Sequence, residues 1–135
     1  MKKLFLLLAV VISLLSCIKE KDGSGSFLTG NGLFLINEGN FMGGNGSLSF
    51  YSYDSLKIYN DIFLNANGRP LGDVPNSLAI SGERIYIVVN NSGKIEVVNK
   101  NTLESVNTIS DLNAPRNISV ISSTKAYISS MYSNS

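Results

Sequence analysis

The chain has 135 residues, the usual size of a single domain. It carries 11 Lys and Arg against 10 Asp and Glu, so it lacks the strong basic balance that would favour nucleic acid as a partner. It contains no His and a single Cys, which excludes Ser/His/Asp and Cys/His catalytic arrangements and an internal disulfide. We therefore expect no catalytic residues, no metal ligands and no cofactor, and we predict that the protein is not an enzyme.

The N-terminus has the layout of a secretory signal peptide. Two lysines precede an apolar run of 12 residues, 4–15, which is interrupted only by Ser13. A helix that spans a bilayer needs roughly 20 residues, so this run fits the apolar part of a signal peptide instead. The segment Leu14–Cys17 resembles the bacterial lipobox, in which the Cys is lipidated after cleavage in front of it. We predict a signal peptide over 1–16 and a lipid at Cys17; the alternative is an ordinary cleaved signal with an unmodified Cys.

Residues 17–31 are expected to join the lipid anchor to the folded part of the chain. The charged cluster 19–22 partly resembles a surface-export signal of lipoproteins from gut-dwelling Gram-negative anaerobes, and a solvated tether is an equally good interpretation. The Gly-Ser stretch 23–26 is typical of a flexible linker. The lipid would make the membrane itself a partner. The predicted location is the outer membrane, with the protein anchored by its lipid and exposed at the cell surface.

From residue 32 onward the sequence predicts an all-β fold. Short apolar or alternating runs are separated by Asn, Gly, Asp, Ser and Pro, as in strands joined by turns. No run has the period of an amphipathic helix. The strand around Tyr86 is apolar almost throughout, which predicts burial on both of its faces. The expected strands are 33–37, 47–53, 57–63, 77–80, 84–90, 94–99, 104–109, 117–121 and 125–131.

These strands recur as an internal repeat with steps of about 40 to 47 residues. The matching segments are Pro75–Ile80 with Pro115–Val120, Ile85–Ile87 with Ala126–Ile128, and Gly46–Ser52 with Gly93–Asn99. Four strands in about 40 residues is the size of a β-propeller blade, which buries its faces against neighbouring blades. We predict that residues 32–135 form the N-terminal part of a β-propeller, about two and a half blades, with one full blade over 75–111. The alternative is a β-sandwich with evenly spaced strands. Since propellers close with four to eight blades, we expect the sequence to be the first part of a longer protein.

The segment Leu35–Phe41, followed by Gly43–Tyr51, resembles the opening of a group of surface lipoproteins from gut-dwelling anaerobes. These proteins are β-propellers with repeats of the YVTN or surface-layer type, and the resemblance covers residues 33–131. Phe41 replaces the Trp that is usual at this position. Some members bind cobalamin and pass it to an outer-membrane transporter. The resemblance implies a non-enzymatic binding protein for a cobalamin-like ligand, with such a transporter as its partner. The alternative is a structural or protein-interaction propeller of the cell envelope that has no small-molecule ligand.

The loop after the first expected strand is the main candidate for ligand contacts. Glu38 would accept hydrogen bonds, the amides of Asn37 and Asn40 would both donate and accept, and Phe41 would add an aromatic face. Loops on a rigid scaffold often carry binding sites. The structural alternative, which we favour, is a turn in which Gly39 has a positive φ and the Asn side chains cap the backbone.

The connection 68–75 between two repeats holds two further candidates. Arg69 and Asp73 are charged residues in a segment otherwise rich in Gly and Pro, and either side chain could contact a ligand or a partner. Charges in such connections are more often simply solvated. We keep Arg69 as a candidate ligand-binding residue, and we favour a solvated loop charge for both residues.

The lipid anchor can be tested by a single substitution. We expect Cys17→Ser to remove the acceptor for the lipid and to release the protein from membranes, because the acyl chains supply the membrane affinity. Membrane and soluble fractions of the producing cells, compared for the wild type and the variant, give the measurement. A variant that stays in the membrane fraction would contradict the lipoprotein interpretation.

Overall fold

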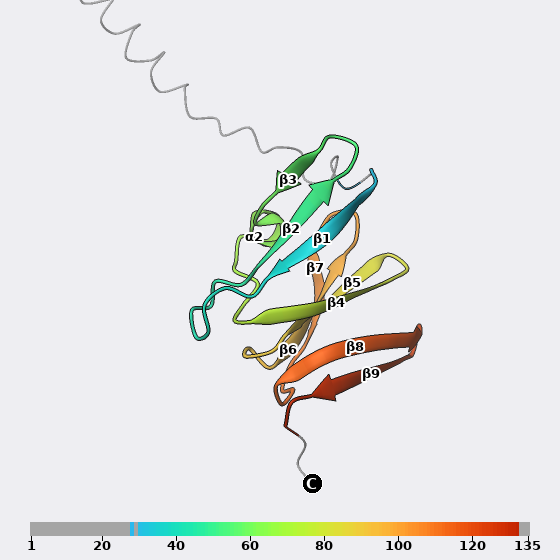
Figure 1. Cartoon of the computed structure of the whole chain (residues 1–135). Coiled ribbons are helices and arrows are strands. Elements are labelled where there is room, and N and C mark those ends of the chain that lie inside the picture. The colour runs from blue at the N-terminus through green and yellow to red at the C-terminus, as the bar shows by residue number, and fades with distance from the viewer. Residues whose placement is uncertain (1–27, 29, 133–135) are drawn as a thin grey trace, which may run out of the picture.

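The computed structural model describes residue 28 and residues 30–132 (Figure 1). The predicted signal peptide, Cys17 and the charged cluster of the tether lie outside these described residues. The described part of the chain forms nine strands and one α-helix. The elements are β1 (Gly32–Asn37), β2 (Ser47–Ser52), β3 (Lys57–Tyr59), α2 (Ile62–Asn67), β4 (Pro75–Ser81), β5 (Arg84–Val89), β6 (Lys94–Asn99), β7 (Ser105–Ile109), β8 (Pro115–Ser122) and β9 (Lys125–Ser130).

The strands form three antiparallel sheets whose order follows the sequence. We call them the first sheet (β1-β2-β3), the central sheet (β4-β5-β6-β7) and the third sheet (β8-β9). The all-β prediction is confirmed, and this arrangement is compatible with a partial β-propeller. The central sheet coincides with the full blade expected over 75–111. Within each sheet every strand pairs with the next one in the sequence through a turn or loop, so the pairing inside a sheet is local.

Helix α2 corrects the prediction of a strand over 57–63 and of no helix. Strand β3 ends at Tyr59, and the chain turns at Asp61, which has φ 53°. The helix has only six residues and buries Ile62 and Phe63. A helix of this length shows no recognisable period in the sequence, so its two apolar residues were indistinguishable from the end of a strand. It ends at Gly68, whose φ of 66° suits a residue without a side chain.

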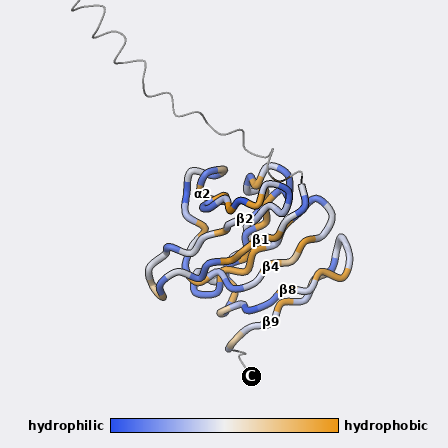
Figure 2. Tube along the Cα trace, turned by 45° about the horizontal axis from the view of Figure 1, so that its top comes forward, coloured by the Kyte–Doolittle hydropathy of each residue, from blue (hydrophilic) through white to orange (hydrophobic). Residues whose placement is uncertain are grey.

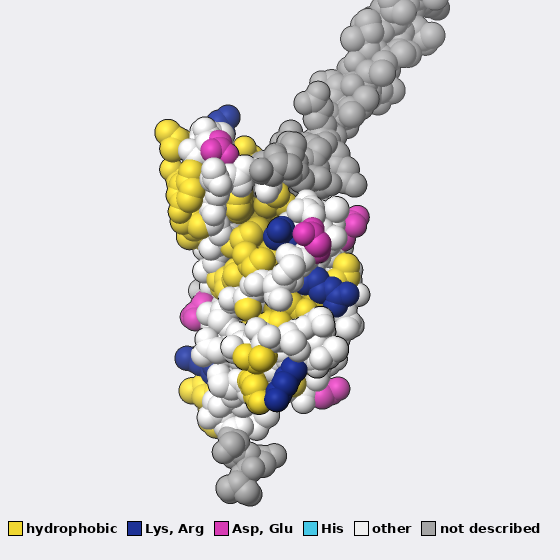
Figure 3. Space-filling model, turned by 90° about the vertical axis from the view of Figure 1, so that its right-hand side faces the viewer, with side chains coloured by type: hydrophobic (Ala, Val, Ile, Leu, Met, Phe, Trp, Pro, Cys, Tyr) yellow, Lys and Arg dark blue, Asp and Glu magenta, His cyan; other side chains and the backbone are white. Residues whose placement is uncertain are grey.

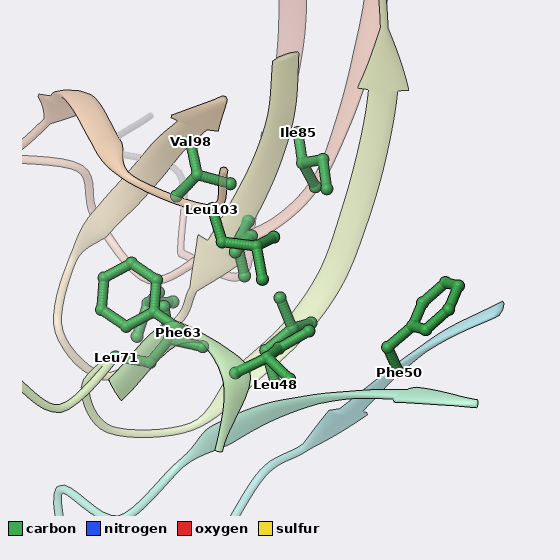
Figure 4. Packing of buried hydrophobic residues seen from close by; sticks show 10 residues of the cluster. Leu48, Phe50, Phe63, Leu71, Ile85, Val98 and Leu103 are labelled. Atoms are coloured by element: carbon green, nitrogen blue, oxygen red, sulfur yellow. The ribbon is translucent and has the colours of Figure 1, made fainter. Parts of the chain in front are cut away.

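The central sheet is covered on both faces, as the sequence of β5 predicted. One face packs on the first sheet and on α2, and Figure 4 shows Leu48 and Leu103 in this layer with Phe63 and Leu71 beside them. The opposite face packs on the third sheet through a second cluster. Alternate residues of a strand point to opposite faces, so an apolar strand such as β5 needs a neighbour on each side. The second cluster contains Val88, Ile95 and Val97, with Tyr86, Leu112, Ile118 and Ile128 packed against it.

The sequence repeat is also a repeat of backbone geometry. The amide of Asn90 donates to the carbonyl of Val74 at 2.9 Å, and one repeat later the amide of Met131 donates to the carbonyl of Ala114 at 2.9 Å. Val74 and Ala114 both have positive φ, at 55° and 43°. The strand that follows each of them is irregular at the same place, directly after its proline. These irregularities lie between Pro75 and Ser77 and between Pro115 and Asn117.

Several connections gather along one edge of the molecule, at the left in Figure 1. We call these segments, 38–46, 68–74, 90–93 and 110–114, the loop rim. Backbone hydrogen bonds join them in sequence, from Gly46 to Gly72 at 3.0 Å and from Leu112 to Gly93 at 2.9 Å. The strands carry most of the hydrophobic stretches, whereas the rim is mostly hydrophilic (Figure 2). Backbone hydrogen bonds therefore hold these connections together along one edge.

The packing of the first sheet on the central sheet predicts an asymmetry between two leucines. Leu48 is fully buried in this layer, whereas Leu56 is 73% exposed. We expect Leu48→Ala to lower the free energy of unfolding by about 2–5 kcal/mol, because it leaves a cavity between two sheets. The matched control, Leu56→Ala, should change it by less than about 0.5 kcal/mol. Urea denaturation of both variants measures the difference, and equal effects would contradict the packing described.

Candidate functional site

The loop between β1 and β2 is held in place by hydrogen bonds within the loop and to the central sheet. The backbone amide of Asn40 donates to Asn45 Oδ1 at 2.8 Å, and the amide of Gly43 donates to the carbonyl of Asn40 at 2.8 Å. The amide of Met42 donates to Asp73 Oδ2 at 2.9 Å, which joins the loop to the connection before β4. The loop therefore has a defined shape although it is nine residues long.

Asp73 is the point at which three segments of the loop rim meet. Its Oδ2 accepts hydrogen bonds from the amide of Met42 and from the side chain of Asn91, and its own amide donates to Ser92 Oγ at 2.9 Å. Its other oxygen, Oδ1, is buried and has no hydrogen-bond partner. The prediction of a solvated loop charge is thus wrong for Asp73, because tertiary contacts between distant loops surround it.

Two large hydrophobic side chains project from the tip of this loop. Phe41 is 71% exposed and Met42 is 78% exposed. Met42 has φ 61°, a conformation that costs energy for a residue with a side chain and that persists where its surroundings fix it. We call these two residues the apolar tip. Preformed loops with exposed aromatic and thioether side chains are typical of binding surfaces.

The predicted contacts at residues 37–41 have different surroundings. Asn37 Nδ2 donates to Ser47 Oγ and Ser49 Oγ, each at 3.1 Å, so this amide joins β1 to β2. The side chains of Glu38 and Asn40 are exposed, and no hydrogen bond or ion pair engages them within the described residues. Gly39 has φ 72°, which agrees with the structural interpretation of the turn. Glu38, Asn40 and Phe41 remain free to meet a partner.

Arg69 lies in a different environment, in an ion pair with a buried carboxylate. Its Nη2 is 2.7 Å from Glu96 Oε1 and its Nη1 is 3.3 Å from Oε2, a two-pronged contact. The Arg69 guanidinium also lies 5.0 Å from the centre of the Phe63 ring. The favoured prediction of a solvated charge is therefore wrong for Arg69. No hydrogen bond or ion pair joins it to residues 37–41 in the described structure.

Glu96 is the centre of this polar cluster. It is 0% exposed and faces the first sheet. Lys94 Nζ lies 2.9 Å from Oε2, and the hydroxyls of Ser105 and Thr108 both donate to Oε1, the latter at 3.2 Å. Burial acts to raise the pKa of Glu96, but the hydrogen bonds from Arg69, Ser105 and Lys94 and the charge of Lys94 outweigh it and lower the pKa to about 2. A saturated, ionised carboxylate of this kind holds elements together and is no general base.

Glu96 was not predicted as a notable residue, because the sequence of its strand indicates only an alternating pattern. The signal was present, since Glu96 is flanked by Ile95, Val97 and Val98, all of them buried. A lone acid in such a run either faces solvent or has partners from elsewhere in the chain. Among these partners, Arg69 is the most distant in sequence, 27 residues before Glu96. No local sequence pattern reveals a contact over that separation.

A cavity of about 290 Å³ lies beside the same loop, between it and α2. Its walls come from the loop backbone, from the start of the helix and from the connection to β4. The lining residues are Gly44, Asn45, Gly46, Ser47, Asp61, Phe63, Leu64, Pro70 and Leu71. The loop between β1 and β2 thus carries the apolar tip and supplies one wall of the cavity.

Charges of one sign do not gather on the face of the molecule that Figure 3 shows. On the face shown in Figure 3, acidic and basic side chains are scattered among hydrophobic and uncharged ones. Among the described residues, no group of three or more Asp, Glu, His or Cys side chains could hold a metal ion. No helix in the described part of the chain is long and apolar enough to cross a membrane.

The Glu96 cluster predicts a specific loss of stability in acid. The carboxyl has a pKa of about 2 in the folded protein against 4.5 as its ordinary value, so the unfolded chain binds the proton more tightly. Its stabilising contribution is therefore complete above about pH 4.5 and is lost as the pH falls towards 2. We expect the free energy of unfolding to fall less steeply over this interval in Glu96→Gln than in the wild type.

The exposed Glu83 offers a matched control for this measurement. Its side chain is 70% exposed and lies 3.9 Å from Lys100, so Glu83→Gln should keep the acid dependence of the wild type. Urea denaturation at several pH values between about 2 and 6 compares the three proteins. Identical slopes for the wild type and Glu96→Gln would show that Glu96 does not contribute in the way described.

Comparison with known families places the chain in a group without an assigned activity. A family model described as a domain of unknown function, DUF5074, matches residues 31–133. No curated protein matches the sequence. The matched segment spans all three sheets, including the loop rim, the Glu96 cluster and the cavity. It also makes up most of the chain, and the protein therefore belongs to the DUF5074 family.

Proposed function

We propose that the protein is a lipoprotein of the cell envelope that acts as a non-enzymatic binding protein at the cell surface. In this proposal Cys17 carries the lipid, the sheets belong to a YVTN-type β-propeller, and the ligand is a cobalamin-like micronutrient that passes to an outer-membrane transporter. The N-terminal pattern and the resemblance of residues 33–131 to surface lipoproteins support the proposal. The DUF5074 match is consistent with it and assigns no ligand.

The observation that carries the binding role is the apolar tip. Phe41 and Met42 are exposed on a loop whose backbone is already fixed by the bond from Met42 to Asp73. A fixed loop loses little conformational entropy when it binds, so more of the contact energy appears as affinity. Glu38 and Asn40 offer unpaired polar groups beside the two apolar side chains. This combination suits a ligand with a broad apolar face and polar groups at its edge, such as a corrin ring with its amide side chains.

A protein-interaction module is the second candidate, and the outward face of the first sheet favours it. Tyr53, Leu56 and Ile58 are exposed there, on the sheet or its turn. Tyr51 stacks edge-on against Tyr53, with ring centres 5.6 Å apart. Exposed aromatic and aliphatic side chains on a sheet commonly mark a protein contact. If this second candidate is correct, the partner is another protein of the cell envelope and no small ligand binds.

Titration of the full-length protein with cyanocobalamin tests the first candidate. We expect saturable binding, weakened about tenfold or more by Phe41→Ala, because an exposed aromatic anchor would lose its contact. The matched control is Tyr53→Ala, which removes an exposed aromatic residue outside the loop rim and should leave the affinity unchanged. No binding by the wild type, together with a co-purifying envelope protein whose capture depends on Tyr53, would favour the second candidate instead.

A further inference from the structure

The cavity beside the apolar tip has an apolar floor and a polar mouth. Phe63 and Leu71 are buried beneath it, and Leu64 and Pro70 continue the apolar lining towards solvent. The opposite wall is the backbone of residues 44–47, where Gly44 presents no side chain and a Cβ would meet no atom within 4 Å. The volume of about 290 Å³ admits a small ring or one arm of a larger molecule.

Two polar groups without a hydrogen-bond partner among the described residues belong to residues that line this cavity, and one is an acceptor whereas the other is a donor. The carboxylate of Asp61 makes no hydrogen bond or ion pair within the described residues, so it is a free acceptor. Asn45 uses its Oδ1 to accept the amide of Asn40 at 2.8 Å, which fixes the orientation of the side chain and leaves its Nδ2 as a free donor. The cavity therefore offers one charged acceptor and one positioned donor above an apolar floor.

We propose that this cavity binds a primary carboxamide attached to an apolar body, with the amide N–H groups donating to Asp61 and the carbonyl accepting from Asn45. This inference rests on the proposed binding function and specifies the chemical group that it would recognise. A carboxylate ligand would be repelled by Asp61, and no Lys or Arg lines the cavity to offset that repulsion. An ammonium group could pair with Asp61 but offers no acceptor to Asn45 Nδ2, so it would use only one of the two polar groups.

The two polar residues allow an exchange that keeps the fold. Asp61 has φ 53°, a conformation that Asn tolerates, so Asp61→Asn should preserve the backbone. Asn45→Asp keeps an oxygen for the amide of Asn40. In the double variant Asp61→Asn/Asn45→Asp, the side chain at position 61 supplies the donor and the side chain at position 45 supplies the charged acceptor. A primary carboxamide carries both types of group and can bind in the reversed orientation.

The test uses benzamide as the probe and N,N-dimethylbenzamide, which has no N–H group, as its control. In NMR titrations of the full-length protein we expect benzamide to shift the signals of residues 44–47, 61–64 and 70–71 in a saturable way. The dimethyl compound should bind about tenfold or more weakly. Asn45→Asp should weaken benzamide binding by a similar factor because it removes the donor, Asp61→Asn should weaken it less because Asn keeps an acceptor oxygen, and the double variant should recover most of the loss caused by Asn45→Asp. Unchanged melting temperatures would show that the variants keep the fold.

Equal shifts by the two probes, the absence of saturable shifts, or a double variant that binds benzamide no better than Asn45→Asp would overturn the carboxamide assignment. These outcomes are separate from those of the cyanocobalamin titration. If cyanocobalamin binds and Asp61→Asn and Asn45→Asp leave its affinity unchanged, the binding function stands and the assignment of this cavity fails. If benzamide binds as described and cyanocobalamin does not, the cavity is a carboxamide site and the cobalamin-like ligand is wrong.

Discussion

The architecture depends on the central sheet, which is apolar on both faces and must be covered on both. Ile85 and Ile87 point towards the first sheet, whereas Val88 and Ile95 point towards the third. A four-stranded sheet of this composition would expose one apolar layer in any two-layer arrangement. Stacking of successive sheets covers both apolar faces of the central sheet. It also determines which edges of the sheets lie together. The loop rim is a consequence, because every connection that leads into or out of a stacked sheet on that side meets its neighbours.

Glu96 is the exception within this apolar layer, and its surroundings show how the fold accommodates it. Four side chains from three separate segments satisfy it, including Arg69 from the connection that carries α2. Such a cluster is costly unless every member is paired, so it joins the connection to the central sheet in one geometry. The same connection supplies the floor of the cavity, through Phe63 and Leu71. The buried ion pair thus helps to set the shape of a surface site that it does not itself line.

The apolar tip and one wall of the cavity belong to the same loop, so both proposed contacts with a ligand depend on the conformation of this loop. Its conformation is set by Asn45 from within and by Asp73 from the next repeat. Loops on rigid scaffolds can present side chains without a large entropic cost on binding. Membership of the DUF5074 family supplies no activity for this surface, so the proposed binding role rests on the chemistry of the loop and of the residues that face it.

The sequence by itself determined the strands and their repeat, because alternation, turn residues and spacing are local properties of the chain. It also indicated the burial of β5 on both faces and the turn at Gly39. The sequence did not reveal the short helix α2, because six residues are too few to show a helical period. The partners of Arg69, Asp73 and Glu96 were decided only by the tertiary structure, because each joins segments 18 to 36 residues apart. The cavity is likewise a product of packing, since its walls come from a loop, a helix and a connection that meet only when the sheets stack.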